Sequence, residues 1–147
     1  MLHHTVRHLG LATALACMSL AAAAAPSAAR QAPAAVESTP ELAKAPWISY
    51  RCDNDKRLRV RYHYGEATAR AQVLADGRST TMLYSPDSNA DITVFEGGGH
   101  KWHIENLPPG QQARAKAGML TRSGTQMVNK RRTAVDDIVR KGCDPVR

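Results

Sequence analysis

The sequence predicts an all-β fold, a small antiparallel eight-stranded β-barrel closed by one disulfide. Three observations lead to this prediction. After about residue 46, apolar and polar side chains alternate in short runs, and helical periodicity is nearly absent. Turn-forming residues separate the runs at short intervals, which is typical of antiparallel barrels and sandwiches. Cys52 and Cys143 bracket nearly all of the runs, so a bond between them would tie the first strand to the last.

The clearest predicted strand covers residues 57–64. Its apolar and aromatic side chains share one face and its basic side chains share the other: Leu58, Val60, Tyr62 and Tyr64 against Arg57, Arg59, Arg61 and His63. This pattern predicts a half-buried strand with a basic outer face. A shorter alternating run at 48–52 comes before it, and residues 53–56 would connect the two as a hairpin.

The other predicted strands follow at short intervals. Asp76-Gly77 is a strong tight-turn signal, because Gly tolerates positive φ and Asp hydrogen-bonds locally. Gly97-Gly98-Gly99 predicts the tip of another hairpin, with an anion-binding nest as the alternative. Asp136-Asp137 is interpreted as a turn before the last strand. The strands expected around these turns are 69–73, 78–84, 92–95, 101–105, 113–120, 126–130 and 138–143.

The first part of the chain predicts export. Residues 1–25 are expected to form a signal peptide, because a basic start precedes an uncharged apolar run that ends in small residues. A membrane anchor is the weaker interpretation, since a span needs about 20 apolar residues. We therefore expect no transmembrane segment in the mature protein. Cys17 could be a lipid acceptor, but Ala14 stands where a bulky aliphatic residue is usual, so we assign Cys17 to the removed peptide.

Two further divisions of the chain are expected. Residues 26–46 are rich in Ala, Pro and Ser without a strong apolar period, which predicts a flexible segment. Residues 47–147 are long enough for a single domain with one modest core. Trp102 and Ile104 are expected in that core, and Trp47 over an end of the barrel.

Removal of the signal peptide leaves two cysteines, Cys52 and Cys143. In the oxidising compartment that export implies, they are expected to form a disulfide, and two buried free thiols are the alternative. The bond would close a loop of about 90 residues and stabilise the fold by about 4–5 kcal/mol in the chain-entropy model. Because a domain of this size is stable by only about 5–15 kcal/mol, loss of the bond would be serious.

The formal net charge of +7 favours anionic partners. In an exported protein these would be lipid head groups, acidic glycans or acidic protein faces, and nucleic acid is not expected. A basic stripe of Arg57, Arg59, Arg61 and Arg70 with His63 is a candidate contact for such a surface. The alternative is a solvated outer face whose charges protect the sheet from edge-to-edge pairing.

Several segments of the predicted domain together resemble a known family. They are Ile48-Ser49-Tyr50-Arg51-Cys52, the basic strand that follows, the Asp76-Gly77-Arg78 turn, the Gly97–Gly99 hairpin and the terminal run Ile138–Pro145. Over about 47–147 the chain is similar to the adhesin complex protein family, small exported β-barrel proteins of Gram-negative bacteria. Their fold is similar to that of the membrane-bound and periplasmic inhibitors of c-type lysozyme. The resemblance implies a protein of the periplasm, outer membrane or cell surface that is linked to adhesion and to lysozyme inhibition.

One loop departs from the lysozyme-inhibitor families. Those families carry a Ser-x-Ser-Gly-x-Arg-Tyr loop that enters the enzyme's cleft, whereas residues 85–91 keep two serines at another spacing and lack the Gly, Arg and Tyr. The adhesin complex proteins lack that motif as well. A lysozyme inhibitor must offer donors to two catalytic carboxylates, and the candidate donors are Ser85, Ser88, Asn89, His100 and Lys101. The alternative for residues 85–91 is an ordinary solvated turn.

The charge of the protein bears on this hypothesis. C-type lysozymes are generally basic, so two basic proteins repel one another at long range, although Asp87 and Asp91 could compensate locally.

Catalysis and cofactor binding receive no support from the sequence. It contains no nucleophile elbow, phosphate loop or paired-carboxylate motif, so we expect no enzymatic activity and no cofactor. His63, His100 and His103 match no zinc-site spacing. The sequence therefore favours a non-enzymatic exported binding protein, and the family resemblance implies that it inhibits c-type lysozyme and mediates attachment. The alternative is a periplasmic envelope module that holds anionic lipid or glycan on its arginine face, with no lysozyme target.

Overall fold

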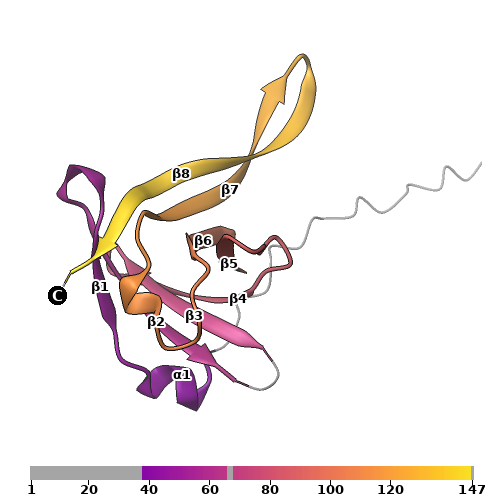
Figure 1. Ribbon diagram of the computed structural model, residues 1–147. Helices are drawn as coiled ribbons and strands as arrows, with labels where there is room; N and C mark the ends of the chain where they lie inside the picture. The colour runs from indigo at the N-terminus through magenta and orange to yellow at the C-terminus, as the bar shows by residue number, and fades with distance from the viewer. Residues whose placement is uncertain (1–37, 66–67, 147) are drawn as a thin grey trace, which may run out of the picture.

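The computed structural model describes residues 38–65 and 68–146. Eight antiparallel strands follow one another round a closed barrel, which confirms the predicted all-β fold (Figure 1). The predicted signal peptide 1–25 and Cys17 lie outside the described residues. The strands are β1 (Ile48–Arg51), β2 (Arg57–Tyr64), β3 (Ala69–Ala75), β4 (Arg78–Tyr84), β5 (Ile92–Gly97), β6 (His100–Glu105), β7 (Gly118–Val128) and β8 (Arg131–Pro145). Three short helical segments accompany them: α1 (Pro40–Lys44), η1 (Asp53–Asp55) and η2 (Gln112–Arg114).

The barrel closes where β1 meets β8. Only two residue pairs join these strands, Tyr50 with Pro145 and Arg51 with Asp144. The predicted disulfide between Cys52 and Cys143 lies directly beside this short ladder, and both cysteines are buried. The covalent bond therefore reinforces the seam of the barrel.

The last two strands differ from the prediction. The expected strand 113–120 begins only at Gly118, and the chain before it forms η2. Asp136-Asp137 is not a turn, because both residues lie inside the 15-residue β8. The turn is instead Asn129-Lys130, with φ values of 49° and 63°. Positive φ at both central residues suits the right-handed twist of a two-residue hairpin, so β7 and β8 form one long ribbon.

Aromatic side chains fill the centre of the barrel, and their polar tips bond to one another. Trp102 is fully buried, as predicted, and its indole Nε1 donates to the Tyr62 hydroxyl at 2.8 Å. The Tyr50 ring meets the Trp102 ring edge-on at 5.4 Å. The Tyr50 hydroxyl donates to the Gln112 carbonyl oxygen at 3.1 Å, which ties η2 across one end of the barrel. Buried aromatic rings can be accommodated in this way because their polar atoms have partners.

The chain before β1 docks on the outside of the barrel. Thr39 caps α1, and Leu42 within it is fully buried. Residues 40–44 of the segment predicted to be flexible thus form a packed helix, because Leu42 supplies an apolar anchor. Trp47 also lies outside the barrel wall instead of over its end, with the guanidinium carbons of Arg59 and Arg61 at 5.4 and 4.6 Å from its ring centroid.

Replacement of both bonded cysteines, Cys52→Ala with Cys143→Ala, should lower the free energy of unfolding by about 4 kcal/mol, because the unfolded chain regains the entropy of a 91-residue loop. Urea denaturation of the mature protein, followed by circular dichroism with and without reductant, measures this change. An equal denaturation midpoint in both states would contradict the structural role of the bond.

The buried tyrosines should make the protein sensitive to alkali. Burial raises the pKa of Tyr50, raises that of Tyr62 well above its ordinary value, and raises that of Tyr64 to about 12. Below pH 10 these tyrosines are protonated in both the folded and the unfolded chain, so their contribution to stability is fully present. Between pH 10 and 12 the unfolded chain releases protons that the folded chain retains, so stability falls as the pH rises.

Tyrosinate absorbance should therefore rise later in the folded protein than in the protein unfolded in urea. Tyr62→Phe removes one buried ionisable group and should make the alkaline loss of stability less steep. Superimposable titration curves for folded and unfolded protein would disprove this account.

Candidate functional site

The loop of residues 85–91 connects β4 to β5, lies along β5 and uses its serines internally. Ser85 is 2% exposed; its Oγ donates to Glu96 Oε2 at 3.0 Å and accepts from the Asp87 amide at 3.2 Å. The Ser88 Oγ donates to the Val94 carbonyl at 3.2 Å and accepts from the Val94 amide at 2.9 Å. Both hydroxyl groups, predicted as donors to a partner, therefore serve to hold the loop against the strand.

The far end of the loop is fixed in the same way. The Asn89 Oδ1 accepts from the Asp91 and Ile92 amides at 2.9 and 3.0 Å, which is the local bonding that favours asparagine in turns. The Asn106 side chain donates to the carbonyl oxygens of Asn89 and Ala90, both at 3.1 Å. The loop is consequently ordered, and its carboxylates at Asp87 and Asp91 face solvent.

Lys101 joins this loop to the β7–β8 ribbon. Its Nζ lies 2.8 Å from Asp87 Oδ2 and 3.5 Å from Asp136 Oδ2, and Asp136 also accepts from the Ser123 hydroxyl at 3.0 Å. The hydrogen bond with Asp87 is the main cause that raises the pKa of Lys101, and the same bond lowers the pKa of Asp87. The ammonium group is thus shared between two carboxylates and is not a free donor.

His100 lies apart from the other four predicted contact residues. Successive strand residues point to opposite faces, so His100 points toward the barrel interior and Lys101 outward. With Arg78, Met82 and Leu120, His100 lines a hollow of about 370 Å³ at the barrel mouth. The structure therefore brings Ser85, Ser88, Asn89 and Lys101 to one surface and leaves His100 on another.

Four exposed carboxylates lie on β5, the loop before it and the ribbon base. We call this surface the acidic face: Asp87, Glu96 and Asp136 around Lys101, and Asp91 at the other end of β5, where it lines a hollow with Lys116 and Lys141. Glu96 stands opposite Lys101 in the β5–β6 register, a pairing that the predicted glycine hairpin could have revealed. Asp136 could not be found from sequence, because it is distant in the chain and was assigned to a turn. The acidic face is a fixed negative surface on a basic protein.

His103 lies beside Lys101 on the same outer surface. Burial, followed by the nearby ammonium, lowers the pKa of His103, and its Nε2 is 3.3 Å from the Thr121 hydroxyl. Its imidazole is therefore held neutral at physiological pH. Within residues 38–65 and 68–146, no group of three or more His, Cys, Asp or Glu side chains is placed to hold a metal ion.

The predicted arginine stripe lies on the outer surface of β2 and its neighbours. The register places Arg51 opposite Arg57 and Arg70 opposite His63. We call this surface the basic face: Arg51, Arg57, Arg59, Arg61 and Arg70. The Arg61 Nε donates to Gln72 Oε1 at 2.7 Å, and its guanidinium also bonds to the Ala43 carbonyl of α1.

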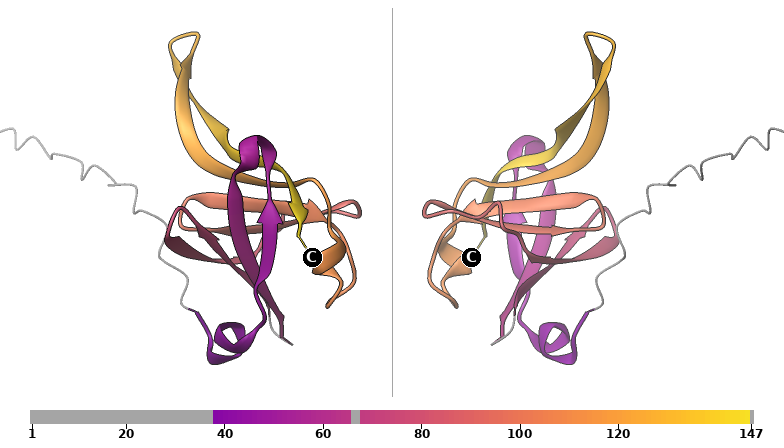
Figure 2. Two further views of the ribbon diagram at one scale, coloured as in Figure 1. Left: turned by 90° about the vertical axis from the view of Figure 1, so that its left-hand side faces the viewer. Right: turned by 90° about the vertical axis from the view of Figure 1, so that its right-hand side faces the viewer.

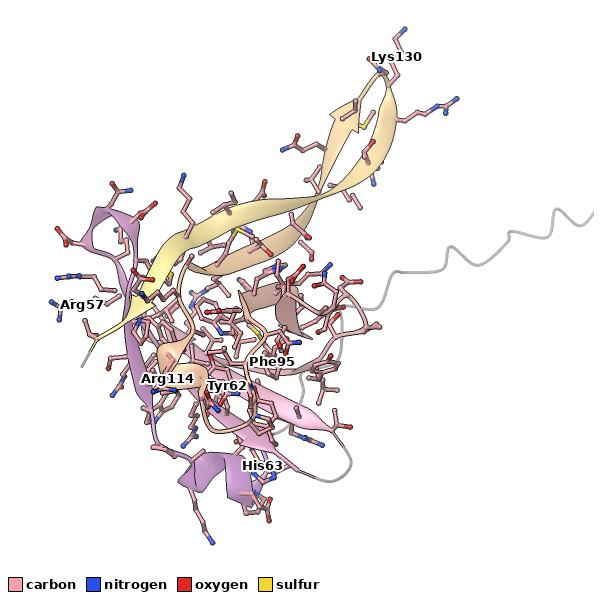
Figure 3. The ribbon with its side chains drawn as sticks, in the orientation of Figure 1. Arg57, Tyr62, His63, Phe95, Arg114 and Lys130 are labelled. Atoms are coloured by element: carbon pink, nitrogen blue, oxygen red, sulfur yellow. A yellow bond between two sulfur atoms is a disulfide. The ribbon has the colours of Figure 1, made fainter. Side chains whose placement is uncertain are left out.

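Three arginines of the basic face lack acidic partners. Among the described residues, the ion pairs do not involve Arg51, Arg57 or Arg59. Their side chains are exposed, as Figure 3 shows for Arg57, and the guanidinium carbon of Arg59 lies 5.4 Å from the centroid of the Trp47 ring. The basic face thus combines exposed cations with one aromatic ring.

Comparison with known proteins yields one family. The family model of the ACP-like domain (Nm-ACP) matches residues 46–145, which covers all eight strands. No curated protein and no solved structure matches the chain. Among the described residues, no helix has the length and apolar character needed to cross a bilayer.

Proposed function

The chain belongs to the adhesin complex protein family through its ACP-like domain, and from this premise we propose that it is an exported binding protein that inhibits c-type lysozyme. The family consists of adhesin-like, non-catalytic domains. Membership supports the view that the protein is exported or lies at the cell surface. The acidic face supports lysozyme as the partner, because it offers negative charge to an enzyme that is generally basic.

The single observation that carries this proposal is the fixed acidic loop. A net charge of +7 opposes encounter with another basic protein, but this repulsion is screened beyond about 8 Å at physiological ionic strength. At contact distance the local charges decide. Asp91 and Asp87, the latter paired with Lys101, are exposed on a loop whose serines and asparagine are already bonded. A loop ordered before binding loses little conformational entropy on binding.

The geometry favours occlusion of the enzyme's cleft from its rim. Ser85 and Ser88 hold the loop in shape and are unavailable as donors to catalytic carboxylates. Asp87 would be repelled by two carboxylates in a cleft of low dielectric, so insertion between them is unfavourable. We infer that Asp87 and Asp91 bind basic residues beside the cleft and that the loop then covers the substrate path.

A lysis assay with c-type lysozyme and the mature protein tests the proposal. Asp87→Asn with Asp91→Asn should weaken inhibition at least tenfold, because each removes a charge-assisted contact. Asp53→Asn with Asp55→Asn is the matched control, since it removes the same charge from η1 and should leave inhibition unchanged. Ser88→Ala and Lys101→Ala should have intermediate effects through the loop's shape and position.

Two results would refute lysozyme inhibition by the acidic face. The first is full lytic activity at a hundredfold excess of the mature protein. The second is an equal loss of inhibition in the Asp87→Asn/Asp91→Asn variant and in the η1 control, because the loss would then depend on net charge alone.

A second candidate function is attachment to anionic lipid or glycan through the basic face. The exposed cations of Arg51, Arg57 and Arg59, the last of them over the Trp47 ring, favour it. Arg57→Gln with Arg59→Gln should then lower the salt concentration at which the protein leaves a heparin column, while the acidic-face variant should raise it. Elution at the wild-type salt concentration would exclude this surface as the contact.

A further inference from the structure

The β7–β8 ribbon continues well beyond the barrel. Strand β6 pairs with β7 only as far as Arg122, and β8 reaches β1 only at its other end. From Gly124 opposite Val135 to Val128 opposite Arg131, the two strands pair with each other alone. We call residues 124–135 the arm. Figures 1 and 2 show it rising away from the body, and Figure 3 shows Lys130 at its tip.

The composition of the arm is unusual for a surface hairpin. Residues 125–134 are all exposed, including Met127 at 65% and Val128 at 46%. Lys130, Arg131 and Arg132 follow the apolar pair, and the arm contains no carboxylate. The register sets Met127 opposite Arg132 and Val128 opposite Arg131, so each face of the ribbon carries one apolar and one cationic side chain at its far end.

We propose that the arm's tip docks on an anionic lipid bilayer, with Met127 and Val128 among the outer acyl segments and Lys130, Arg131 and Arg132 on the lipid phosphates. A basic residue near an anionic membrane surface strengthens binding about fivefold. An apolar tip surrounded by cations is suited to the headgroup boundary, because long basic side chains can bury their methylenes and keep their charges in water.

The tip fits a bilayer better than it fits other occupants. Two exposed apolar side chains are far too few for a standard protein interface, which buries about 800 Å² on each partner. A second copy of the arm would place three cations against three, and basic residues on exposed strands oppose edge-to-edge pairing. A bilayer, in contrast, receives a narrow tip and supplies the opposite charge.

The length of the arm keeps the barrel clear of the surface. Five strand residues on each side rise about 16 Å, at about 3.3 Å per residue. The acidic face, anchored at the ribbon base through Asp136 and Lys101, then lies about two Debye lengths from the phosphates at physiological salt. A docked tip therefore leaves the acidic face accessible and too far from the lipid phosphates to be repelled by them. The inference goes beyond lysozyme binding and does not depend on it.

Co-sedimentation of the mature protein with vesicles tests the proposal. We expect binding to vesicles of 30% phosphatidylglycerol in phosphatidylcholine at 0.15 M salt, and little binding to pure phosphatidylcholine. Lys130→Gln, Arg131→Gln and Arg132→Gln together should weaken binding about a hundredfold. The matched control is Arg114→Gln, Lys116→Gln and Lys141→Gln, which removes the same charge from exposed positions outside both the arm and the basic face and should bind nearly as the wild type does.

A second measurement tests insertion of the apolar tip. Met127→Ser with Val128→Ser should also weaken binding, and its barrel should remain folded because the barrel core does not include either residue. A Met127→Trp variant should gain blue-shifted fluorescence on anionic vesicles and be quenched by brominated acyl chains. Far-ultraviolet circular dichroism and an unchanged urea denaturation midpoint of each arm variant serve as the folding controls.

Four outcomes would overturn the proposal: no binding to anionic vesicles, equal binding to neutral ones, equal loss in the control variant at Arg114, Lys116 and Lys141, or a Met127→Trp signal that vesicles leave unchanged. A dimer in sedimentation analysis that Met127→Ser with Val128→Ser abolishes would overturn it as well, because the arm would then bind a second copy.

Discussion

The bond between Cys52 and Cys143 is the constraint on which the remaining structure depends. Strands β2 and β3 share a ladder of seven residue pairs, whereas β1 and β8, like β4 and β5, share only two. So short a seam would open readily, since each residue pair contributes little by itself. A covalent link between residues 91 apart in sequence keeps the seam closed and places both chain ends of the barrel on one side.

The closed seam also determines where the excess length of the last two strands must go. β8 is held at Cys143 by the disulfide, and β7 begins against Trp102, where a Cβ on Gly118 would approach the ring to 2.5 Å. Both strands are therefore fixed at the same end. β6 has only six residues and supports β7 as far as Arg122, so the surplus leaves the barrel as the arm.

Strands and turns could be predicted wherever the sequence shows alternation or strong turn residues. The hydrogen-bond partners of the side chains could not be predicted. The β2 pattern, the Asp76-Gly77 turn and the glycine hairpin were predicted because side-chain period and positive φ leave local signals. Asn129-Lys130 escaped prediction because it contains neither Gly nor Pro. The serines of residues 85–91 were predicted to be free donors. They are not free, because Ser88 bonds to the backbone of β5, and no local sequence pattern indicates that the loop contacts this strand.

The net charge conceals a separation of opposite charges on the barrel. In a closed ring of eight strands, β2 and β6 lie four positions apart, so the basic face and the acidic face occupy opposite sides of the wall. A charge of +7 describes the protein at a distance, where salt screens it, and each face acts at contact. Attachment to an anionic surface and binding of a basic protein are consequently compatible in one domain, because each uses a different side of the same closed sheet.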